Sequence, residues 1–216
     1  MSTLSTFTNK VVIFGLSDFA ELAHFYLTTD TSYEVVGFTV NESFLNTKTF
    51  KGLPVVPFES LENFFPPADY MLFLPMTGIK MNNARKSLYL DGKLRGYSFA
   101  SYVSSKATIF NTLVGENCFI LENNTIQPFV TIGNNVIMWS GNHIGHHSVI
   151  EDHVFFTSHV VLSGHCVVKE RCWLGVNATI RDGVILGEGC LVAMGSLITK
   201  PTESDGFWLS IQWIGK

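Results

Sequence analysis

The sequence predicts two folded parts: a small parallel α/β unit over residues 1–100 and an all-β solenoid of short strands over residues 101–200. Two patterns predict them. Before residue 100, short apolar strands alternate with helical segments, which is the order of a parallel α/β unit. From Val114 to Ile198 a large apolar residue recurs at every sixth position, a period that neither a helix nor a hairpin sheet has. Residues 201–216 follow as an apolar tail.

The composition supports packed parts and an oligomer. Hydrophobic residues make up 46% of the 216 residues, enough for a packed core, which excludes a disordered chain. Charged residues make up only 15%, against about 25% in soluble domains generally, so we expect some surface to be buried against other subunits. The net charge of -4 argues against binding nucleic acid or an anionic membrane through a basic field.

The ends of the chain and its cysteines bear on the compartment. Residues 1–6 have neither the basic nor the apolar segment of a secretory signal. The longest apolar runs, such as Val11–Phe14, are far below the ~18 residues that a membrane span needs. The cysteines show no CxxC pair and no other sign of an oxidising compartment. We therefore expect a cytoplasmic protein with no membrane partner.

The N-terminal elements follow in a simple order. Lys10–Gly15 reads as a buried strand that ends in a glycine turn, and Phe19–Leu27 as the helix after it. Val35–Thr39 reads as a second strand, Tyr70–Leu74 as a third, and Asn82–Leu90 as a further helix. Such units bind ligands at the carboxyl ends of their strands.

The turn after the first strand is a candidate nucleotide site. It has Gly15 but Ser17 in place of the second glycine of G-x-G-x-x-G, so an NAD site is disfavoured. A nucleoside diphosphate at the helix N-terminus fits better, with Ser17, Asp18 and backbone N–H groups around it. Asn41 and Thr77, which follow the other two strands, are further candidate substrate-binding residues. A purely structural turn is the alternative.

The repeat defines the second part. The chance that fifteen positions in one chosen frame are all apolar is on the order of 10⁻⁵ at this composition. Each hexad would be one short strand and a corner, three hexads would make a triangular coil, and fifteen anchors imply five coils stacked about 4.8 Å apart. The anchors are Val114, Ile120, Ile126, Ile132, Met138, Ile144, Ile150, Phe156, Leu162, Val168, Leu174, Ile180, Leu186, Val192 and Ile198.

The cysteines fall in the same frame. All four occupy the inward position four residues after an anchor, where most residues are small: Cys118, Cys166, Cys172 and Cys190. A thiol there is a compact apolar filler. The ligand spacings of a zinc site are absent, so we expect no redox or metal role for them.

This repeat resembles the hexapeptide-repeat acyltransferases, and the resemblance implies a left-handed parallel β-helix. A Rossmann-like domain followed by such a helix resembles the bacterial nucleotide-sugar acetyltransferases. These include the enzymes that acetylate UDP- or dTDP-linked 4-amino-4,6-dideoxy sugars for glycan assembly, as in the bacillosamine and O-antigen pathways, and the sialic acid O-acetyltransferases. Gly15-x-Ser17 and the segment Ser101–Ala107 carry the second resemblance. The chain departs from it at Tyr102-Val103-Ser104, where family members commonly have His-Pro-Ser.

Six of the seven histidines lie between residues 143 and 165, and their positions within the six-residue repeat divide them into groups. Four share the corner position three after an anchor, so consecutive ones lie on successive corners: His147, His153, His159 and His165. Of these four, only His147 and His165 are 18 residues apart and so stack on the same corner. One chain therefore cannot gather all four around one metal ion. The H-x4-H pair of the γ-class carbonic anhydrases is absent. We therefore expect no metal.

His146 lies outside that register, two residues after its anchor. The resemblance implies that it is the catalytic base, at a coil edge facing the neighbouring subunit, and imidazole can accept a proton near neutral pH. A solvated corner histidine is the alternative, and His143 is the next candidate base. Family members often place an acid directly after the histidine to orient it. This chain has His147 there, so we expect Asp152, Glu151 or a backbone carbonyl to orient the ring.

The resemblance also places the acyl donor, acetyl-CoA. It implies an oxyanion donor from the backbone near Ser163–Gly164, 18 residues beyond His146 and therefore stacked one coil away, unless Gly164 is required only by the corner. Coenzyme A would lie along the later coils between subunits, with Lys200 at its phosphates and the apolar tail Phe207–Ile214 covering its pantetheine arm or docking on the trimer. The resemblance implies contacts with backbone amides around Gly175, Ala178, Ala193 and Gly195, and His143 is also expected near the coenzyme.

The resemblance therefore implies an acetyl-CoA-dependent N-acetyltransferase. It would be a homotrimer that acetylates the amino group of a UDP- or dTDP-linked 4-amino-4,6-dideoxy sugar, and the resemblance implies direct transfer with no covalent enzyme intermediate. A sugar O-acetyltransferase of the sialic acid type is one alternative. A non-catalytic scaffold or sugar-nucleotide sensor is the other.

Overall fold

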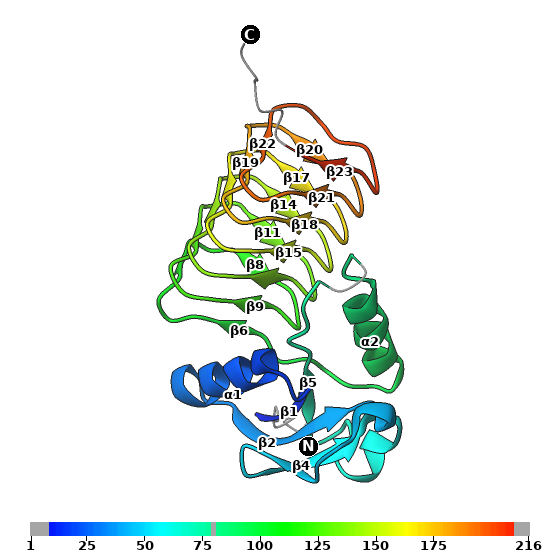
Figure 1. The fold of residues 1–216 in the computed structure, drawn as a ribbon. Coiled ribbons are helices and arrows are strands. Elements are labelled where there is room, and N and C mark those ends of the chain that lie inside the picture. The colour runs from blue at the N-terminus through cyan, green and yellow to red at the C-terminus, as the bar shows by residue number, and fades with distance from the viewer. Residues whose placement is uncertain (1–8, 79–80, 210–216) are drawn as a thin grey trace, which may run out of the picture. The chain divides into compact units, whose positions relative to one another are not determined.

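The computed structural model describes residues 9–78 and 81–209. They separate into two compact units (Figure 1). Residues 9–76 and 88–100 form the first, and residues 77–78, 81–87 and 101–209 form the second. Among the described helices, none has the length and apolarity that crossing a membrane requires.

The first unit is a five-stranded sheet in the order β3-β4-β2-β1-β5. All neighbouring strands are parallel except β3 and β4. Its strands are β1 (Lys10–Phe14), β2 (Glu34–Val40), β3 (Thr49–Phe50), β4 (Leu53–Pro57) and β5 (Met71–Phe73). Its helical segments are α1 (Asp18–Asp30), the short 3-10 helices η1 (Glu42–Phe44) and η2 (Phe58–Asn63), and the later part of α2 (Asn83–Leu94).

The predicted strands and helices of this unit are confirmed, and β4 is an addition. Its sequence, Leu53-Pro54-Val55-Val56-Pro57, has two prolines, which cannot donate to a sheet ladder and so argue against a strand. The structure uses Val55 and Val56 as buried residues of the strand nonetheless. The central strand β1 is the most buried, with Val11, Val12 and Ile13 fully inaccessible.

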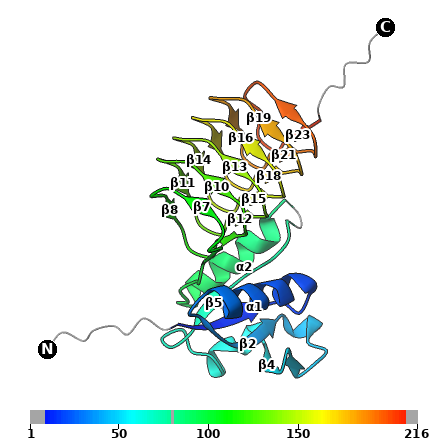
Figure 2. The same ribbon diagram turned by 90° about the vertical axis from the view of Figure 1, so that its left-hand side faces the viewer.

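The second unit is a triangular parallel β-helix of two-residue strands arranged in three sheets (Figures 1 and 2). Sheet 1 holds β7 (Thr108–Ile109), β10 (Thr125–Ile126), β13 (His143–Ile144), β16 (Val161–Leu162), β19 (Thr179–Ile180) and β22 (Leu197–Ile198). Sheet 2 holds β8 (Leu113–Val114), β11 (Thr131–Ile132), β14 (Val149–Ile150), β17 (Val167–Val168) and β20 (Ile185–Leu186). Sheet 3 holds β6 (Tyr102–Val103), β9 (Phe119–Ile120), β12 (Ile137–Met138), β15 (Phe155–Phe156), β18 (Trp173–Leu174), β21 (Leu191–Val192) and β23 (Phe207–Trp208).

The pairing register confirms three hexads per coil. Within β10 and β13, Thr125 pairs with His143 and Ile126 with Ile144, so each strand meets the one 18 residues later. The second residue of each pair is an anchor and points inward. From Ile120 onward the anchors form one buried core, in which no side chain is more than 5% exposed. This continuous apolar stack is what the six-residue period builds.

The corners depend on left-handed backbone. The corner residues, which recur every six positions in the register three after the anchors, have a positive φ of 45–80° at fifteen successive corners from Asn111 to Gly195. Glycine adopts this conformation readily, and asparagine and histidine are among the residue types that tolerate it best. The residues there are Asn111, Asn117, Asn123, Phe129, Asn135, Gly141, His147, His153, His159, His165, Arg171, Asn177, Gly183, Gly189 and Gly195. The corner conformation therefore explains why histidine is tolerated at four of the clustered positions.

The cysteines lie in the core as predicted. Cys118, Cys166, Cys172 and Cys190 are buried free thiols. Burial raises the pKa of Cys118 and of Cys172 to about 12, which keeps these thiols uncharged at neutral pH. They fill space in the core of the β-helix.

Residues 77–78 and 81–87 pack on the outer face of sheet 3. Gly78 lies against the indole of Trp173, where a Cβ would come 2.6 Å from Cδ1. The guanidinium of Arg85 lies 5.9 Å from the ring centroid of Phe155 and is fully buried. This cover explains why Phe155, which points outward from sheet 3, is only 4% exposed.

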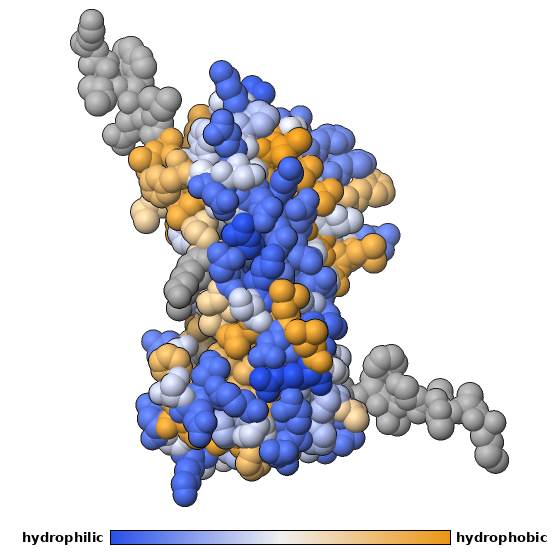
Figure 3. Space-filling model, turned by 90° about the vertical axis from the view of Figure 1, so that its right-hand side faces the viewer, coloured by the Kyte–Doolittle hydropathy of each residue, from blue (hydrophilic) through white to orange (hydrophobic). Residues whose placement is uncertain are grey.

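The outer surface of the β-helix alternates between polar and apolar zones. Figure 3 shows a band of hydrophilic side chains running along the β-helix, with hydrophobic side chains on both sides. Exposed apolar residues on sheets 1 and 2 and the corners beside them include Leu113, Phe129, Val149, Val161, Ile185, Met194 and Leu197.

Candidate active site

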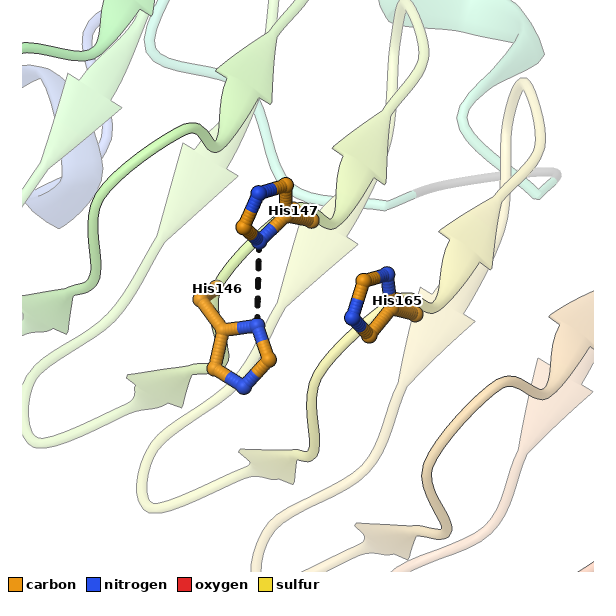
Figure 4. Close-up of side chains that lie close together, drawn as sticks. All are labelled: His146, His147 and His165. Atoms are coloured by element: carbon orange, nitrogen blue, oxygen red, sulfur yellow. Dashed lines mark hydrogen bonds between the residues drawn. The ribbon is translucent and has the colours of Figure 1, made fainter.

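Three histidines converge at one corner of the β-helix (Figure 4). His146 and His147 lie in the corner between β13 of sheet 1 and β14 of sheet 2, and His165 lies one coil later, between β16 and β17. The Nδ1 atoms of His146 and His147 are 3.1 Å apart. The rings of His147 and His165 stack, with centroids 4.9 Å apart and an interplanar angle of 13°. The ring of His146 stands across both, at 87° to each.

The preceding coil supports this cluster from below. The side-chain Oε1 of Gln127 accepts a hydrogen bond from the backbone N–H of His146 at 2.9 Å. The ring of Phe129 lies against the ring of His147, with centroids 4.6 Å apart. Three successive coils thus position the histidines through backbone and ring contacts, while the imidazoles themselves are exposed. Solvent-borne molecules can therefore reach them.

Gly164 makes room for the ring of His146. A Cβ at Gly164 would lie 2.8 Å from Cε1 and 2.9 Å from Nε2 of His146, so any larger residue would displace the imidazole. Among the described residues, the N–H of Gly164 has no hydrogen-bond acceptor. Sequence reasoning placed Gly164 beside His146, one coil away, and the structure does bring these two together.

The orientation of His146 differs from the prediction. The carboxylate of Asp152 accepts hydrogen bonds from the backbone and side-chain nitrogens of Asn134, at the corner between sheets 2 and 3. Glu151 accepts from the backbone N–H of Glu170 at 3.0 Å. Neither acid contacts His146, because one further hexad carries the chain to another corner of the triangle. The partner of the His146 Nδ1 within the chain is His147.

The four corner histidines lie at the predicted corners of the triangle. The conclusion that histidines of one chain cannot gather around a metal ion, however, considered only these four. His153 and His159 lie at the two other corners, so the four corner histidines do not meet. His146 nevertheless joins His147 and His165, and one ligand atom of each lies within 4.8 Å of the others. His147 and His165, 18 residues apart, were expected to stack, and the member not expected is His146, which is next to His147 in the sequence.

His143 and Lys200 are not members of the three-histidine cluster. His143 is the outward residue of β13 and is partly exposed. Lys200 is exposed and follows β22. Their expected contacts with a coenzyme remain predictions.

In the first unit, three of the residues expected to bind the substrate lie at the end of the central strand β1. Gly15 has a φ of 108° and donates its N–H to the carbonyl of Thr39 at 2.8 Å. Ser17 is the N-cap of α1, is exposed and makes no side-chain capping hydrogen bond, and Asp18 is the first residue of the helix. Because β1 lies between β2 and β5, this turn is at a switch in strand order, where α/β units bind ligands.

The other two candidates follow neighbouring strands. Asn41 comes directly after β2, and its Nδ2 donates to Oε1 of Glu59 at 3.2 Å. Thr77 is exposed and belongs to the second unit. A role for either in binding substrate remains a prediction.

Two family models match the repeats. Residues 111–143 match the bacterial transferase hexapeptide of six repeats, and residues 167–200 match the hexapeptide repeat of succinyl-transferase. The chain carries the hexapeptide repeats of bacterial transferases. A search among curated proteins gives no match.

Solved structures share the fold of this hexapeptide-repeat protein over most of its length. The acetyltransferase domain of PglB from Neisseria gonorrhoeae is 17% identical, with a TM-score of 0.76 over 90% of this chain and 93% of that one. A variant of perosamine N-acetyltransferase from Caulobacter crescentus, in complex with CoA and GDP-perosamine, is 21% identical, with a TM-score of 0.79 over 92% of both chains. WeeI from Acinetobacter baumannii is 20% identical, with a TM-score of 0.78 over 91% of this chain and 94% of that one. The fold is thus a left-handed parallel β-helix preceded by a small α/β unit.

The coenzyme contacts expected along the later coils remain predictions, and the structure shows which backbone groups there already have partners. In this hexapeptide-repeat chain the N–H groups of Gly175, Ala193 and Gly195 already donate to carbonyls of Val192, Trp208 and Val176, at 2.8–2.9 Å. The N–H of Ala178 donates to Gly175, and its side chain is fully buried in the core. These amides are therefore engaged in the coil stack, and any contact with a coenzyme at these residues would use other atoms. Of the predicted tail, residues 210–214 lie outside the described part of the chain.

Proposed function

We propose that this protein is an acetyl-CoA-dependent N-acetyltransferase that acts on a nucleotide-linked 4-amino-4,6-dideoxy sugar, with His146 as general base. The observation that carries the proposal is the setting of the His146 imidazole. One ring nitrogen faces His147 and the other lies against Gly164, on an exposed corner. Structures of the same fold include an N-acetyltransferase that holds CoA and GDP-perosamine together, which supports this class of substrates.

The hydrogen bond between the two histidines prepares the base. In neutral imidazole one nitrogen carries the proton and the other accepts. When Nδ1 of His146 donates to Nδ1 of His147, the Nε2 of His146 keeps its lone pair and faces the side of Gly164. His147 is therefore a positioning residue, in the place where similar acetyltransferases have an acid.

The reaction then needs one proton transfer and one acyl transfer. The Nε2 of His146 takes a proton from the sugar amine as the amine nitrogen attacks the thioester carbonyl. The new C–N bond forms and the C–S bond breaks as the tetrahedral intermediate collapses, and the imidazolium returns the proton to the departing thiolate. The N–H of Gly164, which has no acceptor among the described residues, is suited to stabilise the oxyanion.

The first unit would hold the nucleotide. The exposed N-terminus of α1 offers backbone N–H groups and the hydroxyl of Ser17, which favour phosphate oxygens. Gly15 allows a close approach because it has no side chain. The acid Asp18 repels phosphate, so it would face the ribose or the base, whose hydroxyl and N–H groups donate to a carboxylate.

The active form would be a homotrimer in the cytoplasm, with the His146 corner at the seam between subunits. The charged fraction of 15% is low, and the neighbouring side chains of Phe129, Val149 and Val161 are 69%, 39% and 41% exposed. Burying them against another copy would remove this apolar surface from water. Coenzyme A would occupy the same seam along the later coils, with Lys200 at its phosphates.

The test is turnover of the variant His146→Ala. Release of the coenzyme A thiol from acetyl-CoA is measured with amino and hydroxy sugars, both free and nucleotide-linked. We expect a loss of roughly 10²–10⁴-fold in kcat with the fold intact. His159→Asn is the matched control, because it changes an exposed histidine at another corner for a residue that the corner conformation accepts.

Each other outcome has a clear meaning. Full activity of His146→Ala would refute the assignment of the base. Acetylation of hydroxy sugars only would make the protein an O-acetyltransferase. No binding of coenzyme A in calorimetry would leave a non-catalytic scaffold or sensor.

A further inference from the structure

We infer that His146, His147 and His165 form a binding site for a divalent transition-metal ion, and that the bound ion blocks the base. The second half of this inference rests on the proposed function, and the first half does not. The site is the exposed corner shown in Figure 4.

The separations suit a single ion. Zinc binds imidazole nitrogen at about 2.0–2.1 Å in tetrahedral geometry, which places ligand nitrogens roughly 3.3–3.4 Å from one another. The Nδ1 atoms of His146 and His147 are 3.1 Å apart, and one nitrogen from each of the three rings lies within 4.8 Å of the others. Because all three side chains are exposed, a rotation that closes the longest gap by about 1.4 Å meets no core packing.

The backbone beneath the ligands is held firmly. The N–H of His147 donates to the carbonyl of Pro128 at 3.3 Å, and the N–H of His165 donates to the carbonyl of His146 at 2.9 Å. The parallel rings of His147 and His165 come from equivalent corners of successive coils, so both present their edges to the same space. Ligands on a rigid scaffold lose little conformational freedom when an ion binds.

The donor set selects the kind of ion. Three neutral imidazoles suit zinc, copper, nickel or cobalt, and they do not suit calcium or magnesium, which take oxygen ligands. Three protein ligands leave the fourth tetrahedral position to solvent. The corner conformation explains why residues 147 and 165 tolerate histidine, but His146 is outside that register and completes the set.

The ion and the catalytic hydrogen bond need the same atoms. As a base, His146 carries its proton on Nδ1 and donates it to Nδ1 of His147. A metal ion on these two nitrogens needs the lone pair of each, so the proton of His146 moves through solvent to Nε2. An Nε2 that carries a proton cannot accept one from the sugar amine. Metal binding therefore shuts off proton transfer without any change of fold.

The experiment separates the two halves. Chelator-treated protein is titrated with zinc chloride in a calorimeter and with cobalt chloride in a spectrophotometer, where tetrahedral cobalt absorbs visible light. We expect one ion per chain for the wild type and an affinity lower by about tenfold or more for His165→Asn. Asparagine fits the left-handed corner, so this variant keeps its fold. His159→Asn is the matched control and should bind the ion as the wild type does.

The activity arm uses the same variants. Zinc should inhibit acetyl transfer by the wild type at the concentrations at which it binds, a chelator should restore the rate, and His165→Asn should need more zinc by the factor found in the binding titration. Absence of a one-to-one ion, or equal affinity in His165→Asn and the wild type, overturns the site. Binding without inhibition of an active enzyme overturns the blocking role. If no acetyl transfer is found at all, the proposed function fails, while the binding titration still decides the site.

Discussion

Replacement of Arg85 by methionine should destabilise the second unit by about 4 kcal/mol, within a range of roughly 1–7 kcal/mol. Arg85 is fully buried. Its guanidinium donates to the backbone carbonyl and side-chain oxygen of Asn135, to Oδ1 of Asn82 at 3.1 Å, and to the carbonyl of His153 at 2.8 Å. Methionine is of similar length and leaves these four acceptors, and the carbonyl of Val154 at 3.4 Å, without this donor.

The magnitude follows from two opposing effects. Hydrogen bonds from a charged donor contribute about 1.5–3 kcal/mol each, so four contribute roughly 6–12 kcal/mol. Against this, burial lowers the pKa of Arg85 from 12.5 to about 9. At 1.36 kcal/mol for each pKa unit, keeping the cation buried costs about 5 kcal/mol. The difference favours arginine and leaves it charged at neutral pH.

Urea unfolding followed by tryptophan fluorescence measures the effect, because Trp173 of β18 lies against Gly78 of the segment that Arg85 holds. Lys86→Met is the control, since Lys86 pairs with Glu170 at the partly exposed surface and should cost less than about 1 kcal/mol. If Arg85→Met proves as stable as Lys86→Met, the buried guanidinium does not hold this segment on the β-helix. Should Arg85→Met fail to fold, Arg85→Lys keeps the charge, loses the planar fork, and should show an intermediate loss.

Two other variants test the site and the corner. Gly164→Ala should lower kcat at least about tenfold with little change in unfolding free energy, because the new methyl meets the ring of His146 and, at 3.1 Å, the carboxylate of Asp182, and both side chains are exposed and can shift. Gly145→Ala should destabilise the fold, because its Cβ would lie 2.4 Å from the backbone of Ser163. For His153, burial lowers the pKa from 6.5 to about 4, so the unfolded chain takes up a proton that the folded one refuses, and stability should fall by up to about 3 kcal/mol as the pH drops from about 6.5 to 4.

Each of these has a direct check. Steady-state kinetics and thermal melts of the two alanine variants separate a moved ring from a broken coil, and equal kcat for Gly164→Ala and the wild type would contradict the placement of His146. For the pH effect, urea midpoints of the wild type and of His153→Asn are compared from pH 7 to pH 4. Identical slopes of stability against pH would show that His153 is not the group that refuses the proton.

The fold was predictable because each inward position must satisfy a local requirement. The side chain at every sixth position points into the core in every hexad, and so does the one four residues later. The anchors and the four cysteines could therefore be predicted from the sequence period alone. The strand β4 could not, because its prolines oppose the pattern that its buried valines support. The packing of residues 77–78 and 81–87 on sheet 3 was also missed, since no periodic signal links Arg85 to Asn135, 50 residues away.

The candidate site was predictable in part. His146 and Gly164 were paired correctly because a coil has 18 residues, which follows from the period alone. The orienting role assigned to Asp152 failed because nearness in sequence carries the chain to a different corner. His147 was set aside as an interruption of the usual acid, whereas its Nδ1 supplies the contact that the acid would supply.

By itself, the amino-acid order determined a triangular stack with a six-residue period, because apolar burial repeats at each hexad and needs no distant partner. Only the folded coil decided which imidazoles meet. Left-handed corners and an 18-residue turn bring His146, His147 and His165 to one edge and send His153 and His159 to others. Contacts between coils depend on the direction in which each side chain points, and the backbone conformation of the folded coil sets that direction.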